Sequence, residues 1–322
     1  MDISIVICTY NRSHGLDRVL GQLAEQKLPS ELAWEILVVD NNSTDDTPEI
    51  VGRFAQQHPD LDLRYVFEPS QGLSFARNRA VREAKGEIVA FTDDDVFIDT
   101  GWVGAIAEVL PREEFMGFGG KVIPQVPPDA PPWLVSKGRF ALNRGGVIVS
   151  HNPGDVQREY TGKDPRPVGA NLFFRRTAFE RFGLFRTDLG KSGDAVFFGE
   201  DVEFTARLEA GGARLLYVPT AVVYHPVDSA RLTKRVFRQY YYQIGRARAR
   251  LSRYPSHAVK YQGIPRHLFR KLAVRVGEAA VAIAMLRRER WFYYELEIRS
   301  LLGELIGCYG LRSHGTRNRS HI

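Results

Sequence analysis

The chain has 322 residues, of which 44% are hydrophobic and 25% charged, and its formal net charge at pH 7 is +6. This composition is typical of a globular protein and predicts one large α/β domain or two smaller ones. The two cysteines, Cys8 and Cys308, exclude a disulfide framework, and we expect Cys8 to be a buried free thiol in a reducing compartment. The N-terminal residues lack the features of a secretory signal, and no stretch reaches the about 18 uncharged apolar residues of a spanning helix. We therefore expect a cytoplasmic protein.

Charge is distributed unevenly along the chain. Residues 226–322 contain 20 Lys and Arg against 6 Asp and Glu, a formal charge of +14, whereas residues 1–225 contain 24 against 32, a formal charge of −8. An acidic body followed by a basic C-terminal third says something about binding partners rather than about the fold.

Strand and helix patterns alternate through the first 93 residues. Short β-prone runs predict strands over 3–8, 35–40, 63–68 and 87–93, and apolar residues at helical spacing predict helices over 15–27, about 44–57 and 74–85. This alternation predicts βαβ units and a largely parallel sheet.

Polar residues follow each of these strands, over 9–12, 40–42, 68–71 and 93–95. Ligands bind at the carboxyl ends of the strands in such sheets, so we expect the four segments to converge on one crevice.

The second part of the chain is less regular. A proline-rich connector over 124–133 marks a boundary, a strand and helix follow over 166–183, a turn and helix over 197–212, and a strand pair or bent strand over 215–226. Two arginine-rich helical segments are predicted over 229–253 and 266–306. The expected domains are 1–226, with halves of about 1–123 and 124–226, then a helical basic region over 227–312 and a polar tail over 313–322.

Three consecutive aspartates, Asp93 to Asp95, end the strand over 87–93. Adjacent carboxylates repel one another and are costly to desolvate without a cation among them. A hard divalent cation is the simplest answer, and magnesium on one or two carboxylates normally takes its other ligands from phosphates and water. The implied substrate is a phosphate ester such as a nucleotide. The alternative is that the aspartates cap the helix near Trp102 and are solvated.

Seven motifs in order resemble the family 2 glycosyltransferases, which are inverting enzymes with the GT-A fold. The motifs are SIVICTYNR, EILVVDNNSTDDT, QGLSFARNRAVREAKGEIVAFTDDDV, GGKV, VGANLFFRR, GEDVEFTARLEAGG and YVPTAVVYHP. They cover about residues 3–226. The resemblance implies a Rossmann-like mixed sheet flanked by helices, to which the basic C-terminal region is a helical extension.

The resemblance also implies a nucleotide-sugar site. Thr9, Tyr10 and Arg12 would lie by the base and diphosphate, Asp40 would accept hydrogen bonds from the base, and Asn42 would support that loop. Strand capping and turn formation are the alternatives for the last two.

Three further residues are assigned to the same site. Gln71 and Gly72 lie where the backbone must approach the ligand closely, and Gly permits that approach. Arg77 would pair with the diphosphate or with Asp93.

Within the aspartate motif, the resemblance assigns Asp93 to the nucleoside side and Asp95 to Mg²⁺ or Mn²⁺. Asp94 would contact the sugar or waters around the metal. His225 would be a further metal or diphosphate ligand, with a structural histidine as the alternative. The metal would neutralise charge that develops on the leaving nucleoside diphosphate.

An inverting transfer needs a base that removes the proton of the acceptor hydroxyl. Glu200 and Asp201 are the candidate pair; the resemblance favours Asp201, and Glu200 would then orient the acceptor or support Asp201. The alternative is that both complement a helix N-terminus. Asn171 would hydrogen-bond the sugar, or would belong to a plain turn, while Trp102 is expected to pack in the core rather than stack on a sugar.

The basic segment over 231–254 interleaves Arg and Lys with aromatic residues. It predicts peripheral contact with an anionic membrane or a lipid-linked diphosphate acceptor, on the cytoplasmic face, with a solvated helix packed on the body as the alternative. No recognised nucleic-acid module surrounds it, so nucleic acid is not an expected partner. Residues 291–305 have the aromatics and period of an interfacial or oligomeric helix.

We therefore predict a metal-dependent, hexosyl- or N-acetylhexosaminyl-type glycosyltransferase of polysaccharide or glycoconjugate biosynthesis. It would move a sugar from a nucleoside diphosphate sugar, most simply a UDP-sugar, to a hydroxyl of a glycan or lipid-linked acceptor. The alternatives are a sugar-phosphate nucleotidyltransferase, whose glycine-rich, lysine-containing loop is absent, and an inactive nucleotide-binding scaffold at a membrane.

Overall fold

The computed structural model describes residues 1–28, 31–134, 138–142, 146–162, 164–192, 195–197, 199–251, 259–261 and 264–317, with backbone alone at 191–192, 195–197 and 310–317. The chain divides into two compact units. Unit 1 comprises Met1–Val126, Val149–Ala195 and Glu200–Pro226, and unit 2 comprises Pro127–Ile148, Val196–Gly199 and Val227–Ile322. Each unit is considered by itself.

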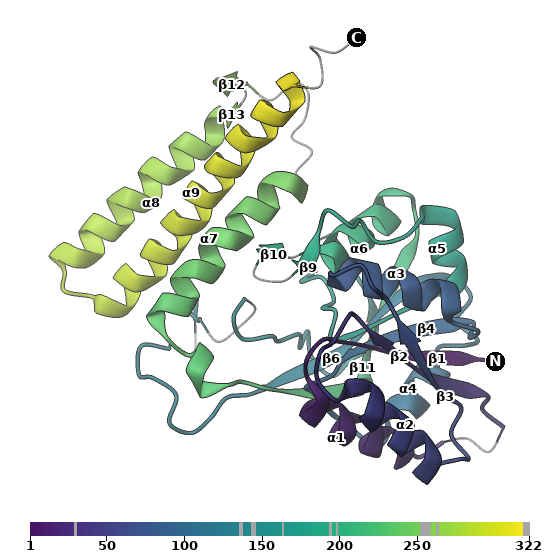
Figure 1. The fold of residues 1–322 in the computed structure, drawn as a ribbon. Helices are drawn as coiled ribbons and strands as arrows, with labels where there is room; N and C mark the ends of the chain where they lie inside the picture. Colours follow the sequence, from purple (N-terminus) through teal and green to yellow (C-terminus); the bar gives the residue numbers. More distant parts are fainter. Residues whose placement is uncertain are drawn as a thin grey trace. The chain divides into compact units, whose positions relative to one another are not determined.

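Unit 1 is built around one twisted sheet (Figure 1). Along the sheet the order is β3-β2-β1-β4-β8-β6-β11-β5, and β7 pairs with β11. The strands are β1 (Ile3–Thr9), β2 (Trp34–Asp40), β3 (Leu63–Phe67), β4 (Ile88–Asp93), β5 (Phe97–Ile98), β6 (Phe115–Gln125), β7 (Arg158–Glu159), β8 (Asn171–Arg175) and β11 (Arg214–Pro226). The short strands β9 (Gly190–Ser192) and β10 (Ala195–Phe197) lie outside this sheet.

Helices cover both faces of the sheet, because successive side chains of a strand point to opposite faces. Ile3, Ile5 and Ile7 of β1 pack in one core cluster, whereas Val6 packs in the other. The first cluster is covered by α1 (Ser13–Ala24), α2 (Thr47–Gln57) and α4 (Trp102–Ala107). The second is covered by α3 (Leu73–Glu83), α5 (Arg176–Phe182) and α6 (Glu200–Ala210).

The central sheet is mostly parallel, as predicted, with antiparallel strands added to it. β1, β2, β3 and β4 pair in parallel as predicted, but β8 runs antiparallel to both β4 and β6. The strand over 215–226 is a single bent strand, β11, whose pairing with β6 shifts register between Val218 and Val222. Strand β6 was not predicted from the sequence, because its glycines at 117, 119 and 120 weaken the strand pattern. Cys8 and Cys308 are both free, as predicted for Cys8, but Cys8 is only partly buried.

Unit 2 is mainly helical. Its elements are η1 (Ser229–Arg231), α7 (Lys234–Leu251), β12 (Lys260–Tyr261), β13 (Ile264–Pro265), α8 (Arg266–Ala284) and α9 (Arg288–Arg317). Helix α9 lies between α7 and α8 (Figure 1).

Helices α7 and α9 pack unusually closely because glycines lie at their crossing. A Cβ atom on Gly245 of α7 would overlap the Ser300 carbonyl, and one on Gly303 of α9 would overlap the Tyr242 carbonyl. Small residues thus let two backbones meet, and this contact holds unit 2 together.

The predicted helix over 266–306 is two helices. The chain turns at Met285–Arg287, where Leu286 has φ +54°, a left-handed conformation that bulky residues rarely adopt. No glycine or proline marks this turn, which is why the sequence analysis missed it. Helix α9 also continues past residue 313, where a polar tail was predicted, as far as Arg317, and residues 318–322 of that tail lie outside the described residues. Among the described helices, none combines the length and apolar character needed to cross a bilayer.

Candidate active site

Hydrogen bonds connect the loop after β1 to the loop after β2. The side chain of Asn11 accepts a hydrogen bond from the Thr44 N–H at 2.7 Å, and the Asp45 carboxylate accepts one from the Ser13 N–H at 3.1 Å. Thr9, the last residue of β1, is buried, whereas Tyr10 and Arg12, which follow it, are exposed. The three residues predicted at the base and diphosphate therefore occupy the end of β1 and the loop after it, whose shape is fixed from the neighbouring strand.

Asp40 is completely buried at the end of β2. Its two carboxylate oxygens accept hydrogen bonds from the Ser43 N–H at 2.9 Å and the Tyr65 hydroxyl at 2.7 Å. Asn42 is exposed and has φ +66°, so it forms the turn after the strand.

Asn41 joins the ends of three elements, and the sequence analysis missed it. Its amide donates to the carbonyls of Glu68 and Ser70 at 3.2 and 2.7 Å, and its oxygen accepts the Gly72 N–H at 2.7 Å. Gly72 has φ +140° and precedes α3, a conformation that a side chain would strain. One buried amide therefore places the Gln71–Gly72 backbone beside the end of β2.

The three aspartates follow β4 and face the β1 loop. Arg12 Nη1 contacts Asp94 at 3.0 Å and also pairs with Asp95. Burial, together with the charge of Asp95, raises the pKa of Asp93, and burial raises the pKa of Asp94 to about 6 despite the nearby Arg12 cation. The site therefore holds more negative charge than Arg12 alone neutralises.

His225, on β11, faces the same carboxylates. Its Nε2 lies 4.0 Å from an oxygen of Asp93 and 3.8 Å from one of Asp95, and the three possible ligand atoms lie within 4.8 Å of one another. His225 Nδ1 lies 3.0 Å from the Pro226 carbonyl, which can only accept, so Nδ1 is the donor there and Nε2 is the ring nitrogen that faces the carboxylates. Two carboxylates and an imidazole nitrogen form a donor set that fits a divalent cation such as Mn²⁺.

The acidic pair at the start of α6 divides into one buried and one accessible carboxylate. Glu200 is buried, and its Oε1 accepts a hydrogen bond from Arg77 Nη1 at 2.5 Å. Burial raises the pKa of Glu200 to about 7, against the opposing effect of Arg77. Asp201 is partly exposed and accepts the N–H groups of Gly169 at 2.9 Å and Val202 at 2.8 Å.

Asn171 has a structural role. It is fully buried, its amide donates to the carbonyls of Lys121 and Ala221, and its oxygen accepts the indole N–H of Trp102. The sugar contact predicted for Asn171 is therefore not available, because every hydrogen-bonding group of its amide is already used inside the sheet. Trp102 is in the core, as predicted.

The matching protein family is described as "Glycosyl transferase family 2", and its model aligns with residues 4–183, more than half of the chain. The chain belongs to the family 2 glycosyltransferases. Its similarity to named members is moderate. It is 28% identical to succinoglycan biosynthesis protein ExoM of Rhizobium meliloti, over 81% of this chain and 78% of that protein. It is 25% identical to glucosyl-dolichyl phosphate glucuronosyltransferase of Haloferax volcanii, over 72% and 71%.

Solved structures show that this family 2 member has the GT-A fold. A mannosyltransferase from Pyrobaculum calidifontis, in complex with GDP-Man and Mn²⁺, superposes with a TM-score of 0.59 at 20% identity, covering 94% of this chain and 86% of that one. TarS of S. aureus in complex with UDP-GlcNAc superposes with a TM-score of 0.51 at 17% identity, covering 98% and 92%. At these identities the likeness shows the fold alone.

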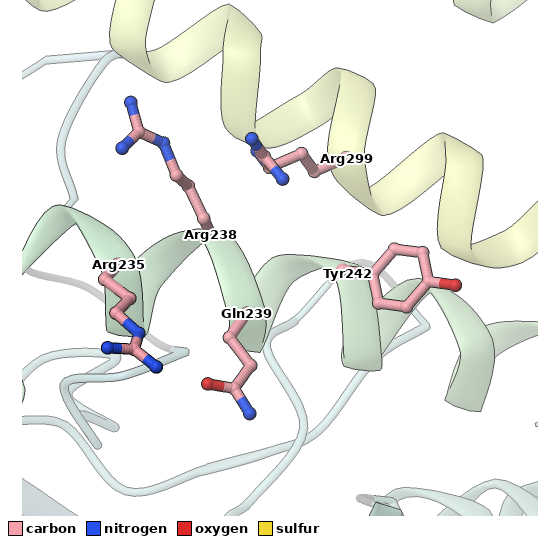
Figure 2. A pocket seen from close by; sticks show the side chains of 5 residues that line it. All are labelled: Arg235, Arg238, Gln239, Tyr242 and Arg299. Atoms are coloured by element: carbon pink, nitrogen blue, oxygen red, sulfur yellow. The ribbon is translucent and has the colours of Figure 1, made fainter.

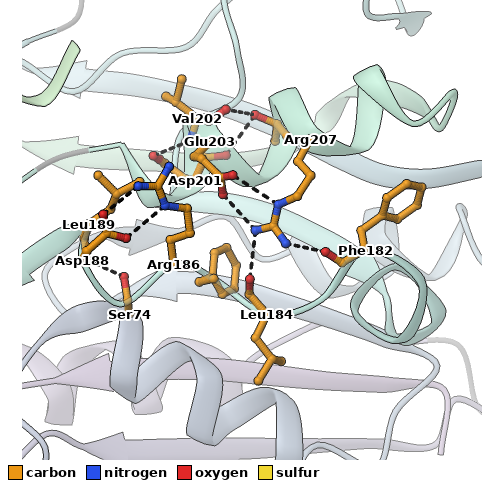
Figure 3. A network of polar contacts seen from close by, with 12 residues as sticks. Ser74, Phe182, Leu184, Arg186, Asp188, Leu189, Asp201, Val202, Glu203 and Arg207 are labelled. Carbon is orange, nitrogen blue, oxygen red and sulfur yellow. Dashed lines mark hydrogen bonds and ion pairs between the residues drawn. The ribbon is translucent and has the colours of Figure 1, made fainter. Parts of the chain in front are cut away.

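A polar network fixes the position of α6 and therefore of its two N-terminal carboxylates (Figure 3). Arg207 donates to Glu203 one turn earlier, at 2.8 Å, and to the carbonyl of Leu184 at 2.9 Å. Ser74 of α3 donates to the Leu189 carbonyl at 2.8 Å. This network was not predicted from the sequence, because the carbonyls of Leu184 and Leu189 that accept these hydrogen bonds lie outside the motifs and are supplied by the backbone.

Unit 2 contains a basic pocket on the surface of α7 and α9 (Figure 2). The pocket has a volume of about 340 Å³ and is lined by Arg235, Arg238, Gln239, Tyr242 and Arg299. Arg238 and Arg299 both donate to the carboxylate of Glu295. Three guanidinium groups near one carboxylate leave an excess of positive charge.

Proposed function

We propose that this family 2 enzyme transfers a hexosyl or N-acetylhexosaminyl group, with inversion, from a nucleoside diphosphate sugar to a hydroxyl of a glycan or lipid-linked acceptor. The observation that carries the proposal is the convergence of Asp93, Asp95 and His225 beside the Arg12 loop, at the carboxyl ends of β1 and β4. A nucleoside diphosphate is the substrate class that such a metal-ligand cluster and an adjacent guanidinium suit together. We infer a UDP-linked donor.

The proposed metal ligands are Asp93, Asp95 and His225, and the proposed metal is Mn²⁺ or Mg²⁺. When bound, the metal supplies a positive charge that stabilises the leaving diphosphate. Arg12 is exposed, pairs with Asp94 and Asp95 in this structure, and is the cation that we assign to the diphosphate when the donor is present. Tyr10 is exposed on the same loop, where it can stack on the nucleotide base.

Asp201 is the proposed base, and the bonding is that of a single displacement. Asp201 removes the proton of the acceptor hydroxyl as its oxygen bonds to the anomeric carbon, and the bond from that carbon to the diphosphate breaks on the opposite side. The Gly169 and Val202 N–H groups donate to the two Asp201 oxygens and hold them in place. Glu200 and Arg77 form the buried pair that supports this helix start, which makes them positioning residues.

Two observations favour an acceptor that carries phosphate or lies at a membrane. The name of the Haloferax relative includes a dolichyl phosphate acceptor, and unit 2 of this chain contains the arginine-lined pocket. Guanidinium groups recognise phosphate oxygens in bidentate fashion. We therefore infer a lipid-linked acceptor and a peripheral location on the cytoplasmic face of a membrane.

Donor binding and catalysis are tested separately. The melting temperature is first measured with UDP, GDP, dTDP and CMP, with and without Mn²⁺, since a ligand of the folded state raises apparent stability by mass action. We expect the largest manganese-dependent increase with UDP. Stabilisation by none of the four nucleotides would contradict the proposed donor site.

Release of the nucleoside diphosphate is then compared in the wild type, the Asp201→Asn variant and the Glu180→Gln variant. Glu180 is an exposed carboxylate on α5, and its variant serves as the control. Loss of the base should lower turnover by about 10²–10⁴-fold while the nucleotide-induced stabilisation persists. Equal turnover in Asp201→Asn and in the wild type would refute the role of Asp201.

A further inference from the structure

The outer side of α8 is apolar along its last three turns. Every exposed residue of 273–286 is apolar or glycine. Val274, Val281 and Ile283 are 54%, 55% and 55% exposed, and Leu286 is 87% exposed. These exposed residues are Ala273, Val274, Val276, Gly277, Ala280, Val281, Ile283, Ala284, Met285 and Leu286. A contiguous exposed apolar surface of this kind marks an interaction site.

Cationic side chains flank this surface at both ends. Arg266, Arg270 and Lys271 are exposed in the first two turns of α8. Arg287, Arg288 and Arg290 are exposed just after the helix. The carboxylate of α8, Glu278, is only partly exposed and is paired with Arg275.

The turn after α8 adds an apolar groove. The groove has a volume of about 280 Å³ and is lined by Ala282, Ile283, Leu286, Arg287, Arg288 and Trp291. Leu286 projects at this turn with φ +54°, a conformation whose steric cost a glycine would avoid. The chain thus exposes a large apolar side chain at a position where folding alone would favour glycine.

We propose that the outer face of α8 and the turn after it bind the surface of an anionic lipid bilayer. The helix would lie in the plane of the membrane, with its apolar side chains among the acyl chains and the flanking arginines at the lipid phosphates. The 19 residues of α8 give a length of about 28 Å for this contact. A second copy of the chain is the less suitable occupant, since it would bring like charges together at both ends.

This surface is different from the one predicted at 231–254. The apolar side of α7 is already used, because Phe237, Ala247 and Ala249 are buried. Helix α8 instead packs on α9 through Leu268, Ala279 and Ala282 and leaves its other side uncovered among the described residues. The proposal stands on this surface alone and does not require the transfer reaction.

The test is co-sedimentation of the full chain with vesicles of phosphatidylcholine, with or without phosphatidylglycerol. We expect the wild type to sediment with the anionic vesicles, and less so with neutral ones or at high salt. The variant Val274→Gln/Val281→Gln/Ile283→Gln should bind at least about tenfold more weakly, because three apolar side chains no longer enter the lipid. Its fold should persist, since surface substitutions of this kind change stability little.

Two further variants exclude trivial explanations. Val156→Gln alters a valine that is 72% exposed in unit 1 and should bind vesicles like the wild type. Leu286→Gly relieves the left-handed leucine, so its melting temperature should be equal or higher while its vesicle binding falls. Weaker vesicle binding at an unchanged or higher melting temperature would show that Leu286 contacts the lipid, and that the loss of binding is not caused by misfolding.

Three results would overturn the proposal. They are absence of wild-type binding to anionic vesicles, equal binding by the triple glutamine variant, and a dimer that the triple variant dissociates while vesicle binding is absent. Light scattering of the eluting protein measures the last of these and would assign the face to a second copy of the chain.

Discussion

The two units use charged side chains in opposite ways. In unit 1 most polar groups of the site are buried or half-buried, and several are bonded to residues far away in sequence, as Arg77 is to Glu200. In unit 2 most cations lie at the surface of three helices, around an uncovered apolar face. Buried charges that are paired through hydrogen bonds fix the geometry of a site. Exposed charges attract a partner but do not fix its orientation. The difference matches a preorganised site in unit 1 and a docking surface in unit 2.

After loss of the proposed base, the largest expected effect comes from changing the acidic cluster of unit 1. Asp95→Asn removes one proposed metal ligand and should lower turnover by about 10²–10³-fold, a size typical of losing one group that stabilises transition-state charge. It should also abolish the manganese-dependent part of the thermal stabilisation by UDP. Asp17→Asn, an exposed carboxylate on α1, is the matched control. Unchanged manganese dependence in Asp95→Asn would remove Asp95 from the metal site.

The close contact of α7 and α9 offers the next largest effect. Gly245→Val places a side chain against the Ser300 backbone, which has no flexible end that can yield, and should destabilise unit 2 by about 3 kcal/mol or more. Gly277→Ala is the control, because nothing lies within 4 Å of the added Cβ atom.

The control should be neutral or stabilising by up to about 1 kcal/mol, as expected for Gly→Ala in an open helix position. Denaturant unfolding followed by helical circular dichroism measures both. Similar stabilities of the two variants would show that α7 and α9 can move apart at little cost. Unit 2 would then be less rigid than the buried, hydrogen-bonded site of unit 1.

A smaller effect is expected from a buried histidine in unit 1. His151 is 2% exposed and lies 2.6 Å from the Tyr160 hydroxyl, and burial lowers its pKa to about 4. In the unfolded chain a histidine binds its proton near pH 6.5, so between about pH 6.5 and 4 the unfolded state holds more protons than the folded state. Stability is therefore lost as the pH falls through this window, by about 3 kcal/mol.

The measurement is the free energy of unfolding at several pH values for the wild type and His151→Gln. The variant should show a shallower loss between pH 6.5 and 4, even if it is less stable at pH 7. Parallel curves for the two proteins would mean that His151 does not set the acid sensitivity of unit 1.

Much of unit 1 follows from local sequence. The β-prone runs, the helical periods and the polar residues after each strand predicted β1 to β4 and α1 to α3 with small errors at their ends. They also placed the segments beginning at Thr9, Asp40 and Asp93 at one edge of the sheet, because parallel strands end on the same side. Ordered motifs predicted the family, and the acidic pattern predicted a divalent cation site.

Other features were decided only by the tertiary structure. Asn41 is an ordinary turn residue in the sequence, but in the structure its side chain hydrogen-bonds the ends of neighbouring elements. Asn171 belongs to a motif, but its side chain forms hydrogen bonds with Trp102 and the backbone. Arg77 and Glu200 lie 123 residues apart, so no local pattern can pair them. In the sequence, the apolar residues of the outer face of α8 cannot be distinguished from those of a buried face. Only the packing of α8 against α9 shows which side is left exposed. Local sequence determines which backbone conformations have low free energy. Long-range packing determines which side chains remain accessible to a ligand or a partner.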